Sequence, residues 1–394
     1  MQSNDIIAVL SNDKAIRFIQ DNMGEDIPSL SLKYAGKTSF NLSVALQLMS
    51  IYKKANRKLP LFVSHLLALD LRSYEQATSQ RIAQYKATFI QGKKMLDITA
   101  GLGIDSLFLA PQFNHVEAVE RNESLHEFAC FNLNKLGVSN IQRVHANGLD
   151  ILTQRKVDWL YVDPDRRSGE KRAVSLELLE PNVLTILPAI KKAAAKAYVK
   201  LSPMFDLVEI TRKFEKVSDI YVLAEKNEVK EVGVVLDWAF EGDVQLHLVD
   251  VSGDFEAHFS FDEYRSKQNI HYPKGYHTYL HIPLALVSKS SCYEYFTSGK
   301  SVLKHADYQL FFSDQSTLYG FRTLKVLNRE TLATKKIKKV FRELNILQVN
   351  IIVKGMDESP HYWHKKWGTR DGGDYYIFLL KSANSEAILC KRII

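Results

Sequence analysis

Hydrophobic positions change their spacing along the chain. Residues 1–88 lack the alternating β-branched runs of strands and show helical spacing instead, for example in Phe40–Tyr52. From about 89 to 240, short strand patterns alternate with helical ones, which predicts a doubly wound α/β sheet with right-handed crossovers. Residues 244–261 alternate like an antiparallel hairpin at the end of that sheet.

The C-terminal third of the chain has a different pattern of hydrophobic positions. Within 321–394 the pattern predicts one helix, a long loop at Met356–Gly373 and three strands. A chain of 394 residues is too long for a single core. We therefore expect four segments, namely a helical region at 1–88, an α/β domain at 89–262, a small ferredoxin-like α+β insert at 263–320 and a further α+β module at 321–394.

The α/β segment begins with a strand at Lys94–Ile98, followed by the small-residue turn Thr99–Gly103 and a helix. The two glycines of this turn allow a sharp bend and a close approach to a ligand. The free N–H groups at the helix start favour an anionic group. A second strand ends at Glu120, 17 positions after Gly103, where a carboxylate can hold a ribose diol.

Two further strands end in small or polar residues, at Asn147-Gly148 and Asp163-Pro164. The carboxyl ends of parallel strands meet at one sheet edge, so these strand tips predict a ligand crevice there. The sequence resembles the class I S-adenosylmethionine-dependent methyltransferases, and the matching residues are Asp97-x-Thr-Ala-Gly-x-Gly-x-Asp105, Glu120, Asn147 and Asp163-Pro164. A dinucleotide oxidoreductase would have a third glycine where Ser106 stands.

The resemblance implies a Rossmann-like seven-stranded sheet whose last strand is antiparallel, with S-adenosylmethionine as the cofactor. The glycine turn would pass under the methionine moiety, and Glu120 would take the ribose hydroxyls. Asn147, where the family usually has Asp, would accept from the adenine amino group. The cofactor contacts implied in this way are Asp97, Thr99, Ala100, Gly101, Gly103, Asp105, Glu120, Arg121, Asn147, Gly148 and Asp163.

The catalytic candidates are Asp163, Pro164, Asp165 and Arg166. Methyltransferases that act on exocyclic base nitrogens carry Asp/Asn/Ser-Pro-Pro-aromatic there, and this chain lacks the second Pro and the aromatic residue, which puts amino methylation in doubt. Uracil C5 methylation also needs a thiolate, but no cysteine is expected near the pocket. Candidate substrate contacts around the pocket are the cations Arg166 and Arg167 and the polar Gln76, Thr78 and Ser79.

The formal net charge of +7 is concentrated at one end of the chain. Residues 321–394 contain 15 Lys and Arg against 7 Asp and Glu. This excess is typical of a nucleic-acid-binding appendage, although a merely solvated basic face is the alternative. The segment resembles the THUMP-like domains appended to some bacterial methyltransferases, which implies RNA binding. Cations would meet phosphates and aromatic rings would stack on bases, and the candidates are Lys335, Lys336, Trp363, Lys365 and Lys366.

The function expected is methylation of a nucleotide in structured RNA, either tRNA or rRNA. The alternatives are a small-molecule or protein methyltransferase whose tail serves oligomerisation, and a binding protein that keeps the fold without catalysis. No metal is expected, because His271, His277 and His281 lack a carboxylate or cysteine at ligand spacing. Widely spaced cysteines, no secretory pattern and no apolar run of roughly 18 residues predict a cytoplasmic protein without a membrane partner. The oligomeric state stays open.

Overall fold

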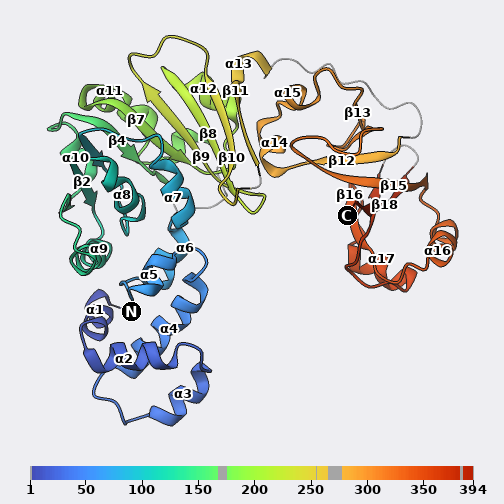
Figure 1. The fold of residues 1–394 in the computed structure, drawn as a ribbon. Coiled ribbons are helices and arrows are strands. Elements are labelled where there is room, and N and C mark those ends of the chain that lie inside the picture. Colours follow the sequence, from blue (N-terminus) through green and yellow to red (C-terminus); the bar gives the residue numbers. More distant parts are fainter. Residues whose placement is uncertain (1, 167–174, 254, 265–276, 382–384, 394) are drawn as a thin grey trace. The chain divides into compact units, whose positions relative to one another are not determined.

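The computed structural model describes residues 2–166, 175–253, 255–264, 277–381 and 385–393. The chain forms two compact units, Met1–Phe259 and Ser260–Ile394, and each has its own sheet and its own hydrophobic cores (Figure 1). The candidates Arg167 and His271 lie outside the described residues. In the part of the chain that is described, no helix has both the length and the apolar character needed to cross a membrane.

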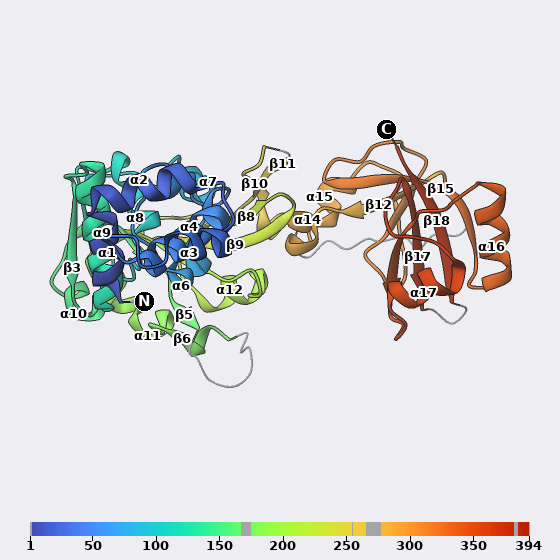
Figure 2. The ribbon, with the colours of Figure 1, turned by 90° about the horizontal axis from the view of Figure 1, so that it is seen from below.

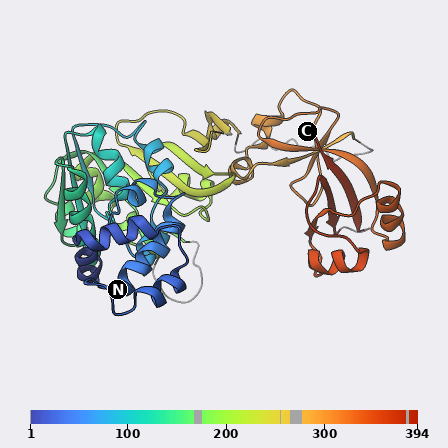
Figure 3. The same cartoon turned by 60° about the horizontal axis from the view of Figure 1, so that its bottom comes forward.

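Helices fill the chain before the first strand, as the sequence predicts. Asn41 begins the longest of them by accepting the backbone N–H of Val44, and Tyr52 ties it to the following loop by donating to the Leu67 carbonyl at 2.8 Å. Helices α1, α2 and α4 lie side by side (Figures 2 and 3). The helices are α1 (Ser3–Leu10), α2 (Asp13–Asn22), α3 (Ile27–Tyr34), α4 (Leu42–Ala55), α5 (Pro60–Ser64), α6 (Leu71–Gln76) and α7 (Gln80–Lys86).

The sheet of the first unit has the strand order β11-β10-β8-β9-β7-β4-β1-β2-β3. Its central strands are buried on both faces, as parallel strands covered by helices should be, and Met95 and Leu96 are both fully buried. The strands are β1 (Lys94–Asp97), β2 (His115–Glu120), β3 (Ile141–His145), β4 (Val157–Val162), β7 (Ala194–Leu201), β8 (Val217–Glu225), β9 (Glu228–Asp237), β10 (Gln245–Asp250) and β11 (Phe255–Ser260).

Seven of these strands reproduce the expected arrangement. In the series β3-β2-β1-β4-β7-β9-β8, the strand β9 runs antiparallel to both of its neighbours, and the pairs β1–β2, β1–β4, β2–β3 and β4–β7 are parallel. The prediction of a seven-stranded sheet with an antiparallel last strand is therefore confirmed. Strands β10 and β11, where the hairpin was expected, extend its edge beyond β8.

Helices cover the sheet between its strands. They are α8 (Ile104–Leu109), the 3-10 turn Ala110–Gln112, α9 (Glu123–Leu136), α10 (Gly148–Leu152), α11 (Val183–Ala193) and α12 (Leu207–Lys213). After β4, a small ribbon pairs β5 (Asp165–Arg166) with β6 (Leu179–Glu180), and the 3-10 turn Leu176–Leu178 precedes β6. The ribbon lies at the carboxyl end of β4, next to the tip where Asp163 stands.

The second unit is built on one seven-stranded sheet of order β13-β14-β12-β15-β18-β17-β16. The elements are α13 (Phe261–Tyr264), β12 (Tyr279–Pro283), α14 (Ala285–Ser290), α15 (Tyr293–Thr297), β13 (Leu303–Lys304), β14 (Phe311–Ser313), β15 (Phe321–Thr331), α16 (Thr334–Glu343), β16 (Asn350–Lys354), α17 (Pro360–Trp367), β17 (Tyr375–Leu380) and β18 (Glu386–Arg392). Strand β15 pairs with β12 on one side and β18 on the other. The segments 263–320 and 321–394, expected as separate modules, therefore share one sheet.

The predicted loop at Met356–Gly373 is wrong, because it contains helix α17. Ser359 caps this helix by accepting the Tyr362 N–H, Pro360 occupies its first turn, and Gly368 ends it with a φ of 74°. Trp363 and Trp367, four residues apart, face the same way and are 5% and 6% exposed. Trp363 was expected to stack on RNA bases, but it belongs to the core against the sheet.

The shared sheet determines where the chain can be cut. Removal of 321–394 would leave β12 without β15, its partner over five residue pairs, so the fragment 1–320 should aggregate. The fragment 1–259 keeps its whole sheet except Ser260, the last residue of the edge strand β11, and should unfold cooperatively near the melting temperature of the same unit in the full chain. Circular dichroism melts and gel filtration of both fragments check this. A well-behaved fragment 1–320 beside an unfolded fragment 1–259 would contradict the division.

Candidate active site

A cavity of about 480 Å³ opens where β1, β2 and β4 end and α8 and α10 begin. All eleven residues expected to contact the cofactor line this cavity, together with Gln76, Thr78, Asp165 and Lys200. The strand tips that the sequence indicated thus meet at one sheet edge. The residue types fit a nucleoside with a charged amino acid tail, since glycine backbone, carboxylates and an amide surround one volume.

The glycine turn forms the floor of this cavity. Gly101 and Gly103 have φ values of 54° and 85°, which side-chain-bearing residues rarely adopt. Glu120 holds the turn against β2, because its carboxylate accepts the N–H of Gly101 and that of Asn122, both at 2.7 Å. Arg143, on β3, donates to the Gly101 carbonyl at a distance of 2.9 Å. The turn is therefore shaped before any ligand enters.

Asp97 supports this turn from below. Its side chain accepts from Ser106 Oγ at 2.6 Å and from the Thr99 N–H at 3.0 Å, and the residue is 1% exposed. Burial raises the pKa of Asp97 to about 7, although the hydrogen bonds from Ser106 and Thr99 oppose the shift. Gly148 closes the same corner, because a Cβ there would lie 2.2 Å from the Ile98 carbonyl oxygen.

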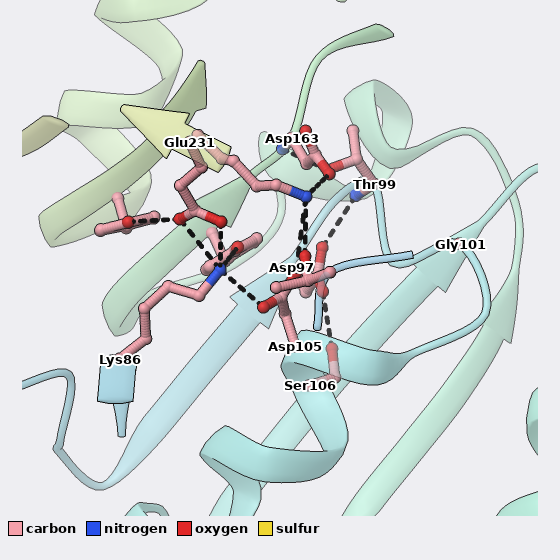
Figure 4. A network of polar contacts seen from close by, with 12 residues as sticks. Lys86, Asp97, Thr99, Gly101, Asp105, Ser106, Asp163 and Glu231 are labelled. Carbon is pink, nitrogen blue, oxygen red and sulfur yellow. Dashed lines mark hydrogen bonds and ion pairs between the residues drawn. The ribbon is translucent and has the colours of Figure 1, made fainter. Parts of the chain in front are cut away.

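A fully buried lysine lies beneath the cavity (Figure 4). Lys86 Nζ is 2.7 Å from an Asp105 carboxylate oxygen and 3.1 Å from Glu231, and it donates to the Tyr161 hydroxyl at 2.8 Å. Lys86 comes from the last turn of α7 and Glu231 from β9. Burying a lone ammonium in a protein is costly, so two carboxylates and a phenol satisfy its three donors.

Sequence patterns did not single out Lys86 or Glu231. Lys86 is one lysine among many at the end of a short helix, and Glu231 sits within a strand of β-branched residues. Neither position carried a clear signal, because Glu231 follows Glu228 and Lys230 in the polar first half of its strand. Tyr198 also donates to Glu231 at 2.7 Å, and its hydroxyl lies 1.9 Å from where a Cβ on Gly233 would be. Gly233 therefore makes room for that contact.

A second lysine joins the buried network to the cavity wall. Lys200, at the end of β7, donates to Asp163 at 2.5 Å and to the Thr78 hydroxyl at 2.9 Å, and its Nζ is 3.8 Å from Asp105. Thr78 in turn donates to Asp105 at 2.8 Å. The side chain of Lys200 is 14% exposed and that of Asp163 is 37% exposed. This pair is the part of the network that a ligand can reach.

The charges of this network stabilise one another. Burial disfavours the ammonium form of Lys200, but the carboxylates of Asp163 and Asp105 outweigh it and raise the Lys200 pKa. Burial likewise disfavours the ionised form of Asp105, yet Lys86 and Lys200 prevail and lower the Asp105 pKa. Burial raises the pKa of Asp163, with Lys200 acting in the opposite direction. Lys200 thus stays cationic, and the carboxyl group of Asp163 beside it holds a proton more readily than usual.

A second cavity of about 610 Å³ adjoins the first one. The two cavities share Gln76, Ala77, Thr78 and Lys200. The rest of the second cavity is lined by Arg57, Lys58, Glu75, Ser79, Ile82, Glu225, Lys226, Glu228, Lys230 and Glu231. Lys200 and Thr78 therefore stand at the boundary between two chambers.

The other predicted site residues lie at several different places in the fold. Ser79 caps α7 and lines only the second cavity. Asn147 caps α10 by accepting the Leu149 N–H, and Arg121 pairs with Glu180 at 2.8 Å. Pro164 is buried and Asp165 is exposed in the ribbon that follows β4. The four lysines Lys335, Lys336, Lys365 and Lys366 are exposed in the second unit.

Two of the three histidines considered as metal ligands, His277 and His281, lie among the described residues and have other partners. Both ring nitrogens of His281 contact hydroxyls, those of Thr323 at 2.8 Å and Ser313 at 2.7 Å. Burial lowers the pKa of His281 to about 4, and His277 lies 3.7 Å from Asp314. Among the described residues, no group of three or more His, Cys, Asp or Glu side chains has an arrangement that could hold a metal ion.

Two comparisons with known proteins concern parts of the chain. Residues 321–392 match the family model described as THUMP domain-like. An uncharacterized RNA methyltransferase of Mycoplasma mobile is 28% identical over 132 residues, which are 33% of this chain and 36% of that protein. The chain thus spans about a third of the length of the curated relative that it matches.

One solved structure matches over the whole length. It is a protein of Porphyromonas gingivalis W83 titled "putative methyltransferase", which is 21% identical, with all of both chains covered and a TM-score of 0.82. The first unit has the class I methyltransferase fold. Strand order, antiparallel β9 and the glycine turn after β1 all agree with this assignment. The cavity lies at the strand tips of this methyltransferase fold, and the second unit carries the THUMP-like segment.

The raised pKa of Asp97 predicts how stability depends on pH. The folded state keeps the Asp97 proton up to about pH 7, whereas the unfolded chain releases it near pH 4, so the contribution of Asp97 to stability falls as pH rises between these values. Asp97→Asn removes this loss. The free energy of unfolding of Asp97→Asn minus that of the unchanged protein should therefore rise by about 2–3 kcal/mol from pH 5 to pH 8.

Urea unfolding at both pH values measures the effect. Asp150→Asn is a matched control, because Asp150 is exposed in α10. If the difference in free energy of unfolding between Asp97→Asn and the unchanged protein stays constant with pH, Asp97 is ionised in the folded state and the prediction is wrong.

Proposed function

We propose that this protein is an S-adenosylmethionine-dependent methyltransferase that acts on structured RNA. The observation that carries the proposal is the cavity at the tips of β1, β2 and β4, where a preshaped glycine turn, Glu120 and Asn147 adjoin the Asp163–Lys200 pair. A nucleoside-binding surface thus lies within the same volume as groups that can orient a nucleophile.

The residues that line the cavity have the chemistry needed to bind S-adenosylmethionine. Gly101 offers open space above its Cα, so the methionine part can approach the backbone of the turn. Glu120 keeps lone pairs for ribose hydroxyls in addition to the two N–H groups that it accepts. The cofactor supplies an electrophilic methyl group, and the residues of this chain fix its position and shape the field at the acceptor.

The RNA part of the proposal rests on the second unit. Helices α16 and α17 pack on the same face of its sheet (Figure 3). Phe341 of α16 and Trp367 of α17 are in contact, at a centroid distance of 5.6 Å. Their buried faces leave Lys335 and Lys336 on one helix and Lys365 and Lys366 on the other exposed. Two adjacent helices with outward lysines form a cationic surface suited to a phosphate backbone. The THUMP domain-like match and the relative named as an RNA methyltransferase agree with this function.

A different methyltransferase function remains the second candidate. Lys336 pairs with Glu330 and Lys339 with Glu343, so part of the basic face of α16 is neutralised within the unit. Such a face could instead serve contacts between copies of a small-molecule or protein methyltransferase. The dependence of RNA binding on salt separates the two functions.

Loss of the carboxylate of Glu120 should weaken cofactor binding. Glu120→Ala removes the acceptor for ribose hydroxyls and frees the Gly101 N–H, so affinity for S-adenosylmethionine should fall by about 1–3 kcal/mol in calorimetry. Glu120→Gln keeps the side-chain volume and tests whether charge matters. Glu123→Ala, three residues on and exposed in α9, is the matched control and should bind as before. Unchanged affinity in Glu120→Ala would remove Glu120 from the site.

Neutralising the outward lysines should weaken RNA binding. Lys335, Lys336, Lys365 and Lys366 changed together to Gln should lower affinity for RNA of any sequence and reduce the slope of log affinity against log salt by up to about 3–4. Fluorescence anisotropy with a tRNA pool at several salt concentrations measures both. The control changes four exposed lysines of the helical region, Lys14, Lys33, Lys37 and Lys54. Equal slopes for the two variants would favour the second candidate function.

A further inference from the structure

The two chambers that meet at Lys200 divide the site into a cofactor side and an acceptor side. The first chamber holds the glycine turn, Glu120 and Asn147. The second lies beyond Thr78 and Lys200, on the side of β9 and the β8–β9 turn. A methyl group delivered from the first chamber would meet its acceptor at this boundary, so the lining of the second chamber indicates what the acceptor is.

The lining of the second chamber is unsuited to a flat base. Among the described residues that line either cavity, Tyr161 is the one aromatic side chain, and it is 2% exposed with its hydroxyl bonded to Lys86. Enzymes that hold a target base usually stack it on an exposed ring. Apart from Ala77 and Ile82, the wall consists of hydroxyl, amide and charged side chains, which can hydrogen-bond to sugar and phosphate.

The rim of the second chamber offers free cations. Three of its four acids are held by cations, since Glu228 pairs with Lys230, Glu231 with Lys86 and Glu225 with Arg81. The fourth acid, Glu75, lies beside Lys58, which donates to its backbone carbonyl at 3.0 Å. Arg57 and Lys226 are exposed, and within the described residues their side chains form no ion pair. These two side chains can therefore meet phosphates on either side of a bound sugar.

The charge beside the boundary selects the chemistry of the acceptor. An amine that accepts a methyl group becomes a cation, which the ammonium of Lys200 would oppose. A hydroxyl that accepts a methyl group must shed a proton and gains negative charge on its oxygen as it does so. Lys200 would stabilise that charge, and Asp163, 2.5 Å from Lys200, is positioned to take the proton.

We propose that the second chamber receives the ribose of an RNA nucleotide and that its 2′-hydroxyl is the methyl acceptor, with Lys200 and Asp163 as the catalytic pair. This rests on the proposed function. The hydroxyl oxygen forms the new bond to the methyl carbon as the carbon–sulfur bond breaks, and that electron pair stays on sulfur. The hydroxyl proton passes to the Asp163 carboxylate and then to solvent. Lys86 and Glu231 act as positioning residues, because their hydrogen bonds and ion pairs go to Asp105, Tyr161, Tyr198 and each other rather than to Lys200 or Asp163.

Product analysis with the full chain tests this directly. Bulk RNA from cells lacking the gene is incubated with the protein and S-adenosylmethionine carrying a labelled methyl group, and the RNA is then hydrolysed in alkali. A 2′-O-methyl group blocks cleavage of the next phosphodiester, so the label should appear in alkali-resistant dinucleotides. Label in ordinary mononucleotides would overturn the inference and leave the proposed function intact. Absence of label from RNA would overturn both.

Variants at the boundary give independent readouts. Lys200→Met should lower kcat at least 100-fold with cofactor affinity changed less than twofold, and Lys200→Arg should restore part of the rate. Arg57→Ala with Lys226→Ala should raise KM for RNA several-fold at unchanged kcat, whereas Lys14→Ala with Arg17→Ala, the same charge change on exposed α2, should do neither. An unaltered rate in folded Lys200→Met, or an unaltered KM in the rim variant, would contradict the assignment. The Arg57→Ala, Lys226→Ala variant and the dinucleotide analysis still test the assignment if Lys200→Met fails to fold.

Discussion

The ammonium of Lys86 is the constraint on which the site depends. It is fully buried between α7 and the sheet, and each of its contacts belongs to a different strand or helix, Asp105 to α8, Tyr161 to β4 and Glu231 to β9. Because an unpaired charge in that position would be strongly unfavourable, these elements are tied to one another by the need to satisfy it. The helical region thereby becomes part of the site, since α7 belongs to it.

Asp105 carries this constraint to the cavity. Asp105 contacts Lys86 on its buried side, and Thr78 and Lys200 on the side of the cavity. The position of Lys200 therefore depends on Asp105, although Lys200 Nζ lies as far as 3.8 Å from the Asp105 carboxylate. Lys200 in turn fixes Asp163 by the shorter contact of 2.5 Å. A chain of alternating charges thus runs from the core to the boundary between the two chambers. Removal of any one member leaves its neighbour with an unpaired charge, so losses along the chain should not be additive.

The sequence was most informative where local chemistry decides structure. The turn at Gly101–Gly103 needs positive φ values, and the strand tips at Glu120, Asn147 and Asp163 follow from the order of a parallel sheet, so these features were predictable. Lys86 and Glu231 were not predictable in this way, because 145 positions separate them and only the tertiary fold shows that each partners the other. In α17, the capping signals at Ser359, Pro360 and Gly368 were present, but the interleaved basic and aromatic residues were interpreted as an exposed loop.

The inward indoles of α17 determine what surface this helix presents. Trp363 and Trp367 pack inward against the sheet, so α17 presents its lysines to solvent while its indoles hold the helix in place. Lys366 lies over the Trp363 ring at 4.7 Å and is thereby ordered on the surface. The surface of α17 therefore combines lysines with two exposed rings, those of His361 and Tyr362, the latter 45% exposed. Under the proposed function, such a surface suits phosphate contacts with few contacts to bases, so most selectivity for a nucleotide would arise in the first unit, at the chambers that adjoin Lys200 and Thr78.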